Sequence, residues 1–181
     1  MRVISGKYKG RRFHPPKAFP SRPTTDFAKE ALFSILTNRI DFEEIVVLDL
    51  FAGTGNISLE FISRGALRTT SVDISPVSCK FMAGLKTSLE IKNWDTVKNE
   101  ALKFCGKKTS EFNVIFADPP FDFKHSMEIP MAIFSNNLLK NNGILIVEHD
   151  KRIHFENTTH FTEIRKYGGV EFSFFSLPAT E

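Results

Sequence analysis

The stretch of this 181-residue chain best suited to chemistry is a stiff turn, Asp118-Pro119-Pro120-Phe121, which directly follows the apolar run 114–117. Four apolar or small residues in a row predict a strand buried on both faces, and the prolines end it because each lacks an N–H and fixes its own φ. Asp118 and the Pro119 carbonyl can then accept both hydrogens of an NH2 group, while Phe121 stacks on the ring that carries it. Open α/β sheets bind ligands at the carboxyl ends of such central strands.

A second candidate is the loop 49–56, which follows the first strand of the main domain and opens its first helix. Gly53 and Gly55 allow the backbone to turn tightly and to approach a ligand closely. The dinucleotide fingerprint requires a third glycine where Ser58 stands, and no Gly-Lys-Ser/Thr of a phosphate loop follows. The loop therefore suits a ligand without a pyrophosphate.

Two further carboxylates lie at the ends of the next strands. Asp73 comes 20 residues after Gly53 and can accept both hydroxyls of a ribose, and Glu100 can accept the amino group of an adenine. Ribose, adenine and no phosphate indicate S-adenosylmethionine. The alternative is that Asp49, Asp73 and Glu100 only cap strand ends. The cofactor-binding candidates are Asp49, Phe51, Ala52, Gly53, Thr54, Gly55, Asp73, Ile74, Glu100, Ala101 and Asp118.

Strands and helices alternate from residue 45 onward, which predicts an α/β fold with a doubly wound, mostly parallel sheet. A hairpin around Tyr167-Gly168-Gly169 adds one antiparallel strand at the C-terminus. We expect an RNA-binding extension at 1–40 (a small hairpin, a proline-rich linker and a helix over 27–36) and a main domain at 41–181. The expected strands are 45–50, 69–73, 95–98, 112–117, 144–148, 161–166 and 171–175, and the expected helices of the main domain are 57–64, 75–89, 100–104 and 126–139.

The N-terminal 25 residues hold seven basic residues and no acid, which leaves 17 of the 24 basic residues and all 21 acidic ones in the rest of the chain. A basic arm on an acidic body is typical of a protein that binds a polyanion, although a solvated basic terminus is the alternative. Thr24 and Thr25 are either helix caps or contacts at the site, with capping favoured. The phosphate-binding candidates are Lys7, Lys9, Arg11, Arg12 and Arg22.

Several other classes are disfavoured by the composition. No apolar run approaches the roughly 20 residues that span a bilayer, and no signal-peptide pattern follows the basic N-terminus. Cys79, Cys105 and the five histidines match no metal-binding or redox spacing. We therefore expect a cytoplasmic monomer without a metal ion.

Six segments in this order closely resemble the RsmD family, bacterial methyltransferases that modify guanine N2 in small-subunit ribosomal RNA. They are 2–11 (RVISGKYKGR), 22–26 (RPTTD), 49–55 (DLFAGTG), 118–121 (DPPF), 147–149 (VEH), and Tyr167-Gly168 with 172–175 (FSFF). The resemblance implies a Rossmann-like class I methyltransferase fold with a seven-stranded sheet, S-adenosylmethionine in the crevice, and ribosomal RNA or the assembling small subunit on the basic arm. Family members typically carry arginine where Phe27 and Lys29 stand, so the chain lacks one positive charge and one fork-shaped donor, which predicts a different grip of the arm on RNA.

Our hypothesis is direct transfer of the sulfonium methyl group to an exocyclic base amine held by Asp118 and Pro119. Adenine-N6 methyltransferases use a similar turn, but 181 residues leave no room for a separate DNA-recognition domain. A non-catalytic RNA-binding module on a methyltransferase-like scaffold is another alternative, although it has no use for this turn. The missing third glycine disfavours a nicotinamide dehydrogenase.

Overall fold

The computed structural model describes residues 1–16, 19, 25–107 and 111–178, and within them it contains a seven-stranded sheet in the order β3-β2-β1-β4-β5-β7-β6. Strand β7 runs antiparallel to both of its neighbours, and all other pairs are parallel, as the sequence predicted. The strands are β1 (Val46–Leu50), β2 (Arg68–Asp73), β3 (Trp94–Lys98), β4 (Phe112–Ala117), β5 (Leu139–His149), β6 (Phe161–Tyr167) and β7 (Val170–Phe175).

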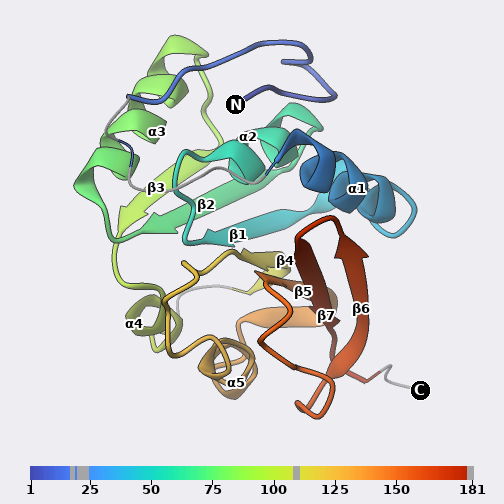
Figure 1. Ribbon diagram of the computed structural model, residues 1–181. Helices are drawn as coiled ribbons and strands as arrows, with labels where there is room; N and C mark the ends of the chain where they lie inside the picture. Colours follow the sequence, from blue (N-terminus) through green and yellow to red (C-terminus); the bar gives the residue numbers. More distant parts are fainter. Residues whose placement is uncertain (17–18, 20–24, 108–110, 179–181) are drawn as a thin grey trace.

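Helices cover both faces of the sheet (Figure 1). One face carries α1 (Asp26–Thr37), α2 (Asn56–Ser63) and α3 (Pro76–Ser88), and the other carries α4 (Ala101–Cys105) and α5 (Glu128–Ser135). The short 3-10 helix η1 (Phe42–Glu44) joins α1 to β1. The apolar side of α1 belongs to the same core as the central strands, since Leu32 and Phe33 pack with Val47 and Phe116.

Side chains that satisfy backbone groups set the starts of two helices. The Thr25 hydroxyl accepts from the Ala28 N–H at 3.2 Å and caps α1, so capping is the role that the structure gives this residue. Ser75 caps α3 in the same way, and Pro76 occupies the first helical position, where its missing N–H costs nothing.

Helix α5 is shorter than the expected 126–139 because an asparagine ends it. Asn137 adopts a left-handed backbone with φ 51°, which asparagine tolerates better than most residues. The Leu138 N–H then donates to the Ile133 carbonyl at 3.1 Å, and the Asn137 N–H donates to the Phe134 carbonyl, the Schellman pattern of a helix end. The chain can therefore enter β5 at Leu139, five residues earlier than expected.

Candidate active site

The carboxyl ends of β1, β2 and β4 meet at one edge of the sheet. Leu50 lies in register with Val72 on one side and with Ala117 on the other, so the chain segments that follow all three strands are neighbours. The Asp118 N–H still points to the Leu50 carbonyl, at 3.5 Å, which extends β4 by one residue. Asp73 and Asp118 therefore flank the start of the glycine loop, as the sequence predicted for this crevice.

Asp73 holds the glycine loop in place. Its Oδ2 accepts from the Gly53 N–H at 2.7 Å, and its Oδ1 accepts from the Ser75 N–H at 2.8 Å. Gly53 and Gly55 have φ values of 53° and 72°, in the left-handed region that favours glycine. A Cβ at Gly55 would lie 2.8 Å from the Trp94 ring, so the loop also has no room for a side chain there.

Phe51, the first residue after β1, has a strained backbone. Its φ of 60° is unusual for a side chain with a bulky ring and costs roughly 1–2 kcal/mol. The Ala52 N–H donates to the Val72 carbonyl at 3.0 Å, and the Phe51 ring packs edge-on against Phe123 at 5.0 Å between centroids. These contacts hold the strained backbone and place the ring beside the Asp118 turn. No sequence pattern signals this conformation.

Asp49 lies beneath the loop and is fully buried. Burial raises the pKa of its carboxyl group to about 7, against the opposing hydrogen bonds from Ser58, and the carboxylates of Asp118 and Asp73 raise it further. The Ser58 hydroxyl also contacts Ser71, whose hydroxyl accepts from the Trp94 indole N–H at 2.7 Å. A buried polar chain thus links β1, α2, β2 and β3 under the crevice.

The turn after β4 presents an aromatic ring to solvent. Pro119 is buried and Pro120 exposed, while the Phe121 side chain is 72% exposed. The Phe123 N–H donates to the Pro120 carbonyl at 2.8 Å and closes the turn. In the described part of the chain, no backbone N–H donates to the Pro119 carbonyl.

The other cofactor candidates line the same edge further out. The Asn99 N–H donates to the Asp73 carbonyl at 3.1 Å, which brings the end of β3 beside the end of β2. Glu100 is partly buried and pairs with Lys103 at 2.8 Å, and the following Ala101 is buried. Ile74 is 67% exposed beside Asp73, whereas Thr54 is buried inside the loop.

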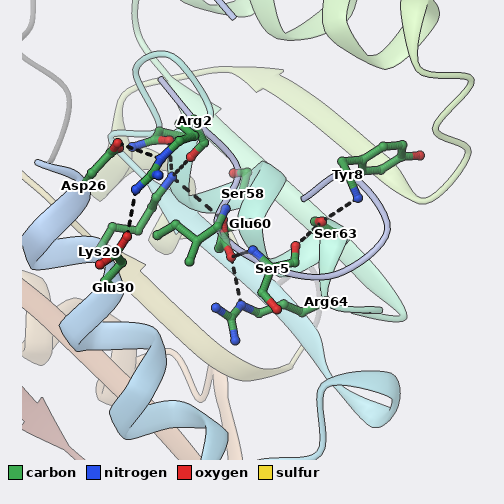
Figure 2. A network of polar contacts seen from close by, with 12 residues as sticks. Arg2, Ser5, Tyr8, Asp26, Lys29, Glu30, Ser58, Glu60, Ser63 and Arg64 are labelled. Atoms are coloured by element: carbon green, nitrogen blue, oxygen red, sulfur yellow. Dashed lines mark hydrogen bonds and ion pairs between the residues drawn. The ribbon is translucent and has the colours of Figure 1, made fainter. Parts of the chain in front are cut away.

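The N-terminal arm is tied to α2 through a buried glutamate that the sequence analysis missed (Figure 2). Glu60 is fully buried, and its carboxylate accepts from the main-chain N–H groups of Ile4 and Ser5 at 2.8 and 3.0 Å. Arg64 donates to the same carboxylate at 2.9 Å. The arm itself forms a single antiparallel bridge, Arg2 to Arg12, where we expected a small hairpin.

Two further main-chain contacts extend this attachment along α2. The Lys7 N–H donates to the Ser63 carbonyl at 2.7 Å. The Tyr8 N–H donates to the Ser63 hydroxyl at 2.9 Å (Figure 2). Gly6 precedes these two residues and lies against α2. No residue with a side chain fits at this position, because a Cβ would lie 1.7 Å from the Ser63 carbonyl oxygen. The close approach of arm and helix therefore depends on a glycine.

Lys29 lies in the interior of the protein, so the predicted change in the grip of the arm on RNA cannot come from a direct contact of this side chain. Its side chain is fully buried, and the ammonium group donates to Asn56 Oδ1 at 2.7 Å and to the Arg2 carbonyl at 2.5 Å (Figure 2). It lies 3.8 Å from the Glu60 carboxylate, while burial lowers its pKa. Lys29 therefore joins α1, the arm and Asn56, the first residue of α2. Phe27, by contrast, is 64% exposed and packs edge-on against Tyr167.

The predicted phosphate contacts are exposed where the structure describes them. Lys7, Lys9, Arg11 and Arg12 all lie on the surface of the arm, and the cationic groups of Lys7 and Arg11 sit over the Tyr8 ring at 5.4 and 5.6 Å. Arg22 and Thr24 lie outside the described residues. Within the described ranges, no group of three or more metal-ligating side chains comes together, and no helix is long and apolar enough to cross a membrane.

Comparison with known proteins supplies the family. Residues 1–176 match the family model described as Conserved hypothetical protein 95. Ribosomal RNA small subunit methyltransferase D of Escherichia coli K12 is 32% identical, over 83% of this chain and 75% of the relative. The chain belongs to the RsmD family of methyltransferases. The protein of the same name in Buchnera aphidicola subsp. Baizongia pistaciae is 29% identical to this chain, over 84% of this chain and 78% of the relative.

The fold is the Rossmann-like class I methyltransferase fold. A solved structure of the proposed methyltransferase yhhF of Escherichia coli superposes with a TM-score of 0.87 at 26% identity, over 99% of both chains. A 16S rRNA N2 methyltransferase of T. thermophilus, solved with AdoMet and guanosine, superposes with a TM-score of 0.67 at 20% identity, over 87% of this chain and 44% of that one. This second likeness concerns the fold alone.

Proposed function

We propose that this protein transfers a methyl group from S-adenosylmethionine to the exocyclic N2 amine of a guanine in small-subunit ribosomal RNA. The observation that carries the proposal is the meeting of the glycine loop after β1 with the Asp118-Pro119 turn after the adjacent strand β4. Relatives named as small-subunit rRNA methyltransferases support RNA as the substrate class. Guanine N2 as the acceptor is what the resemblance of the six sequence segments to the RsmD family implies.

The chemistry of the crevice fits S-adenosylmethionine. The left-handed glycine loop brings backbone close to a ligand, and acidic groups at the strand ends suit the hydroxyls and the amino group of an adenosine. In this assignment, Asp73 and Glu100 hold the adenosine, and Gly53 and Gly55 lie against the amino acid part of the ligand. Bound there, S-adenosylmethionine supplies an electrophilic methyl group on a positively charged sulfur.

The Asp118 turn prepares the acceptor amine. An exocyclic base amine is a poor nucleophile because its lone pair is delocalised into the ring. Acceptance of its two hydrogens by Asp118 and the Pro119 carbonyl favours a pyramidal nitrogen and stabilises the positive charge that develops on it. The N–CH3 bond would form as the S–CH3 bond breaks, with S-adenosylhomocysteine as the leaving group, and the methylated nitrogen would then lose one proton to solvent by way of Asp118. The exposed Phe121 ring fixes the plane of the base, which has to be unstacked to reach the turn.

The basic arm holds the RNA in this proposal. Positive charge comes from four exposed side chains of the arm that α2 anchors, Lys7, Lys9, Arg11 and Arg12. Arg22 completes the set predicted from the sequence. If they contact phosphates, RNA affinity falls steeply with salt, and each charge removed lowers the salt slope by about 0.7–0.9. An RNA affinity that does not change with salt would contradict this assignment.

The test is methyl transfer onto small-subunit rRNA from a strain that lacks this protein. Transfer of a tritiated methyl group is measured, and the modified base is mapped. Asp118→Ala should lower turnover by about two to three orders of magnitude, with a smaller effect on cofactor affinity. Asp122→Ala is the matched control, because it removes an exposed carboxylate four residues into the same loop.

The outcomes separate the alternatives. Full activity in Asp118→Ala would end the catalytic assignment. A methyl group mapped to adenine N6 would favour the other class of amine methyltransferase. A protein that binds rRNA but gives no calorimetric signal with S-adenosylmethionine would be a non-catalytic binding module.

A further inference from the structure

Strand β5 places a second buried carboxylate beside the Asp118 turn. Ala117 and Val147 are the last residues in register between β4 and β5, so the next positions on the two strands are Asp118 and Glu148. Neighbouring parallel strands lie about 4.8 Å apart, and the Asp118 N–H continues the line of β4 toward Leu50. Glu148 is only 6% exposed.

Both carboxylates belong to the same face of the sheet. Side chains alternate along a strand, and Val114 and Phe116 of β4 pack in the core under α1 and α2, as do Ile144 and Ile146 of β5. The next alternate positions are Asp118 and Glu148, which therefore turn to this face.

Two further observations agree with this placement. The Asp118 carboxylate raises the pKa of Asp49, whose carboxyl group bonds Ser58 of α2 on that face. Glu148 lies in register with Phe172 of β7, which packs in the same core.

We infer that Glu148 selects guanine by accepting its N1–H, beside the N2 amine that Asp118 and Pro119 hold. The inference rests on the proposed function. Guanine presents N1–H and N2–H2 as adjacent donors, whereas adenine presents a lone pair at N1. A carboxylate at N1 therefore attracts guanine and repels adenine. Both bases carry an exocyclic amine that the Asp118 turn can bind. The choice of guanine over adenine therefore needs a second group that contacts N1.

The same edge of the sheet also carries aromatic side chains that suit a splayed base. Tyr167 ends β6 at the edge where Glu148 lies, because β6 and β5 both run antiparallel to β7. Phe27, at the start of α1, packs on Tyr167 and is 64% exposed, and Phe121 is 72% exposed on the Asp118 turn. Exposed aromatic rings are typical of sites that stack unpaired bases.

The test replaces guanine by 2-aminopurine at the mapped target position of the small-subunit rRNA. This base keeps the 2-amino group but has a lone pair at N1. The wild-type protein should methylate guanine in strong preference to 2-aminopurine. Glu148→Gln should reduce this preference by about tenfold to a hundredfold, because the glutamine amide donates to N1 of 2-aminopurine and the charge-assisted bond to guanine is lost.

The methylation rates on the two RNAs are measured with the same protein preparation. A loss of folded enzyme lowers both rates equally and does not change their ratio. Glu171→Gln is the matched control, since it neutralises a buried carboxylate of β7 one register position away, opposite His149. This variant should keep the wild-type ratio. If a variant turns over too slowly, competition binding of the two RNAs in the presence of S-adenosylhomocysteine gives the same ratio.

An unchanged preference in Glu148→Gln would overturn the inference and would leave Asp118 to accept both N1–H and N2–H. A wild-type protein that methylates no guanine of this RNA would overturn the proposed function itself. The two failures are therefore distinguishable.

Discussion

The protonation of Asp49 gives a quantitative prediction for cofactor binding. Burial raises the pKa of this carboxyl group to about 7, so near neutral pH it exists in both forms. A cofactor with a sulfonium charge favours the ionised form, and by reciprocity ionisation of Asp49 strengthens binding. The ionised fraction rises from about one tenth at pH 6 to about nine tenths at pH 8.

We therefore expect the Kd of S-adenosylmethionine to fall by up to about tenfold between pH 6 and pH 8. Isothermal titration calorimetry over this range measures the change. S-adenosylhomocysteine carries no sulfonium charge and should show a weaker pH dependence. Asp49→Asn should remove the part of the dependence that belongs to this residue. The ligand's own amino group titrates alike with both proteins, so the difference between them isolates Asp49.

Equal pH dependence in the wild type and in Asp49→Asn would refute this reasoning.

The raised pKa of Asp49 also predicts how the stability of the fold depends on pH. Because the folded pKa lies above the unfolded value of 3.8, the stabilising contribution is complete below that value and is lost as the pH rises through about 7. The loss is on the order of 4 kcal/mol for the apoprotein, and Asp49→Asn should flatten this part of the pH–stability curve.

Two further predictions concern residues around the loop. Gly55→Ala should destabilise the protein by about 1–3 kcal/mol and weaken cofactor binding, because a positive φ and the Trp94 ring both oppose a Cβ. The control is Gly84→Ala on α3, where a Cβ would meet open space. This variant should stabilise the protein by about 0.5–1 kcal/mol in the same urea titration. Lys29→Met should cost about 3–5 kcal/mol in chemical denaturation, because it leaves the buried Glu60 carboxylate without one of its cations. A Lys29→Met protein as stable as the wild type would contradict the role given to this ion pair.

The sequence predicted the order of the elements, the meeting of strand ends at one edge of the sheet and most boundaries to within two residues, because hydrophobic runs and turn residues are local signals. Asp49, Asp73 and Asp118 could be predicted to gather since parallel strands bring their carboxyl ends to one edge. The early end of α5 was not predictable in the same way. It depends on the left-handed backbone of Asn137, which many other asparagines do not adopt.

The attachment of the arm was also beyond sequence reasoning. From the sequence, Glu60 is expected to face solvent on a short helix. In the structure every residue of α2 is buried, and the arm covers the helix. Lys29 likewise reads as a surface cation, and its partners Asn56 and Arg2 lie 27 residues away on either side. The one local signal was Arg64, four residues after Glu60, at the spacing of a helical ion pair. Long-range polar contacts of this kind leave no periodic pattern.

The anchoring of the arm through main-chain groups has a consequence for how such proteins diversify. Ile4, Ser5, Lys7 and Tyr8 are held by their own N–H groups, which every residue except proline possesses. The outward side chains of the arm can therefore change from one species to another while its attachment to α2 stays intact. The side chains that we propose for RNA binding can therefore be exchanged at little cost to the folding of the chain.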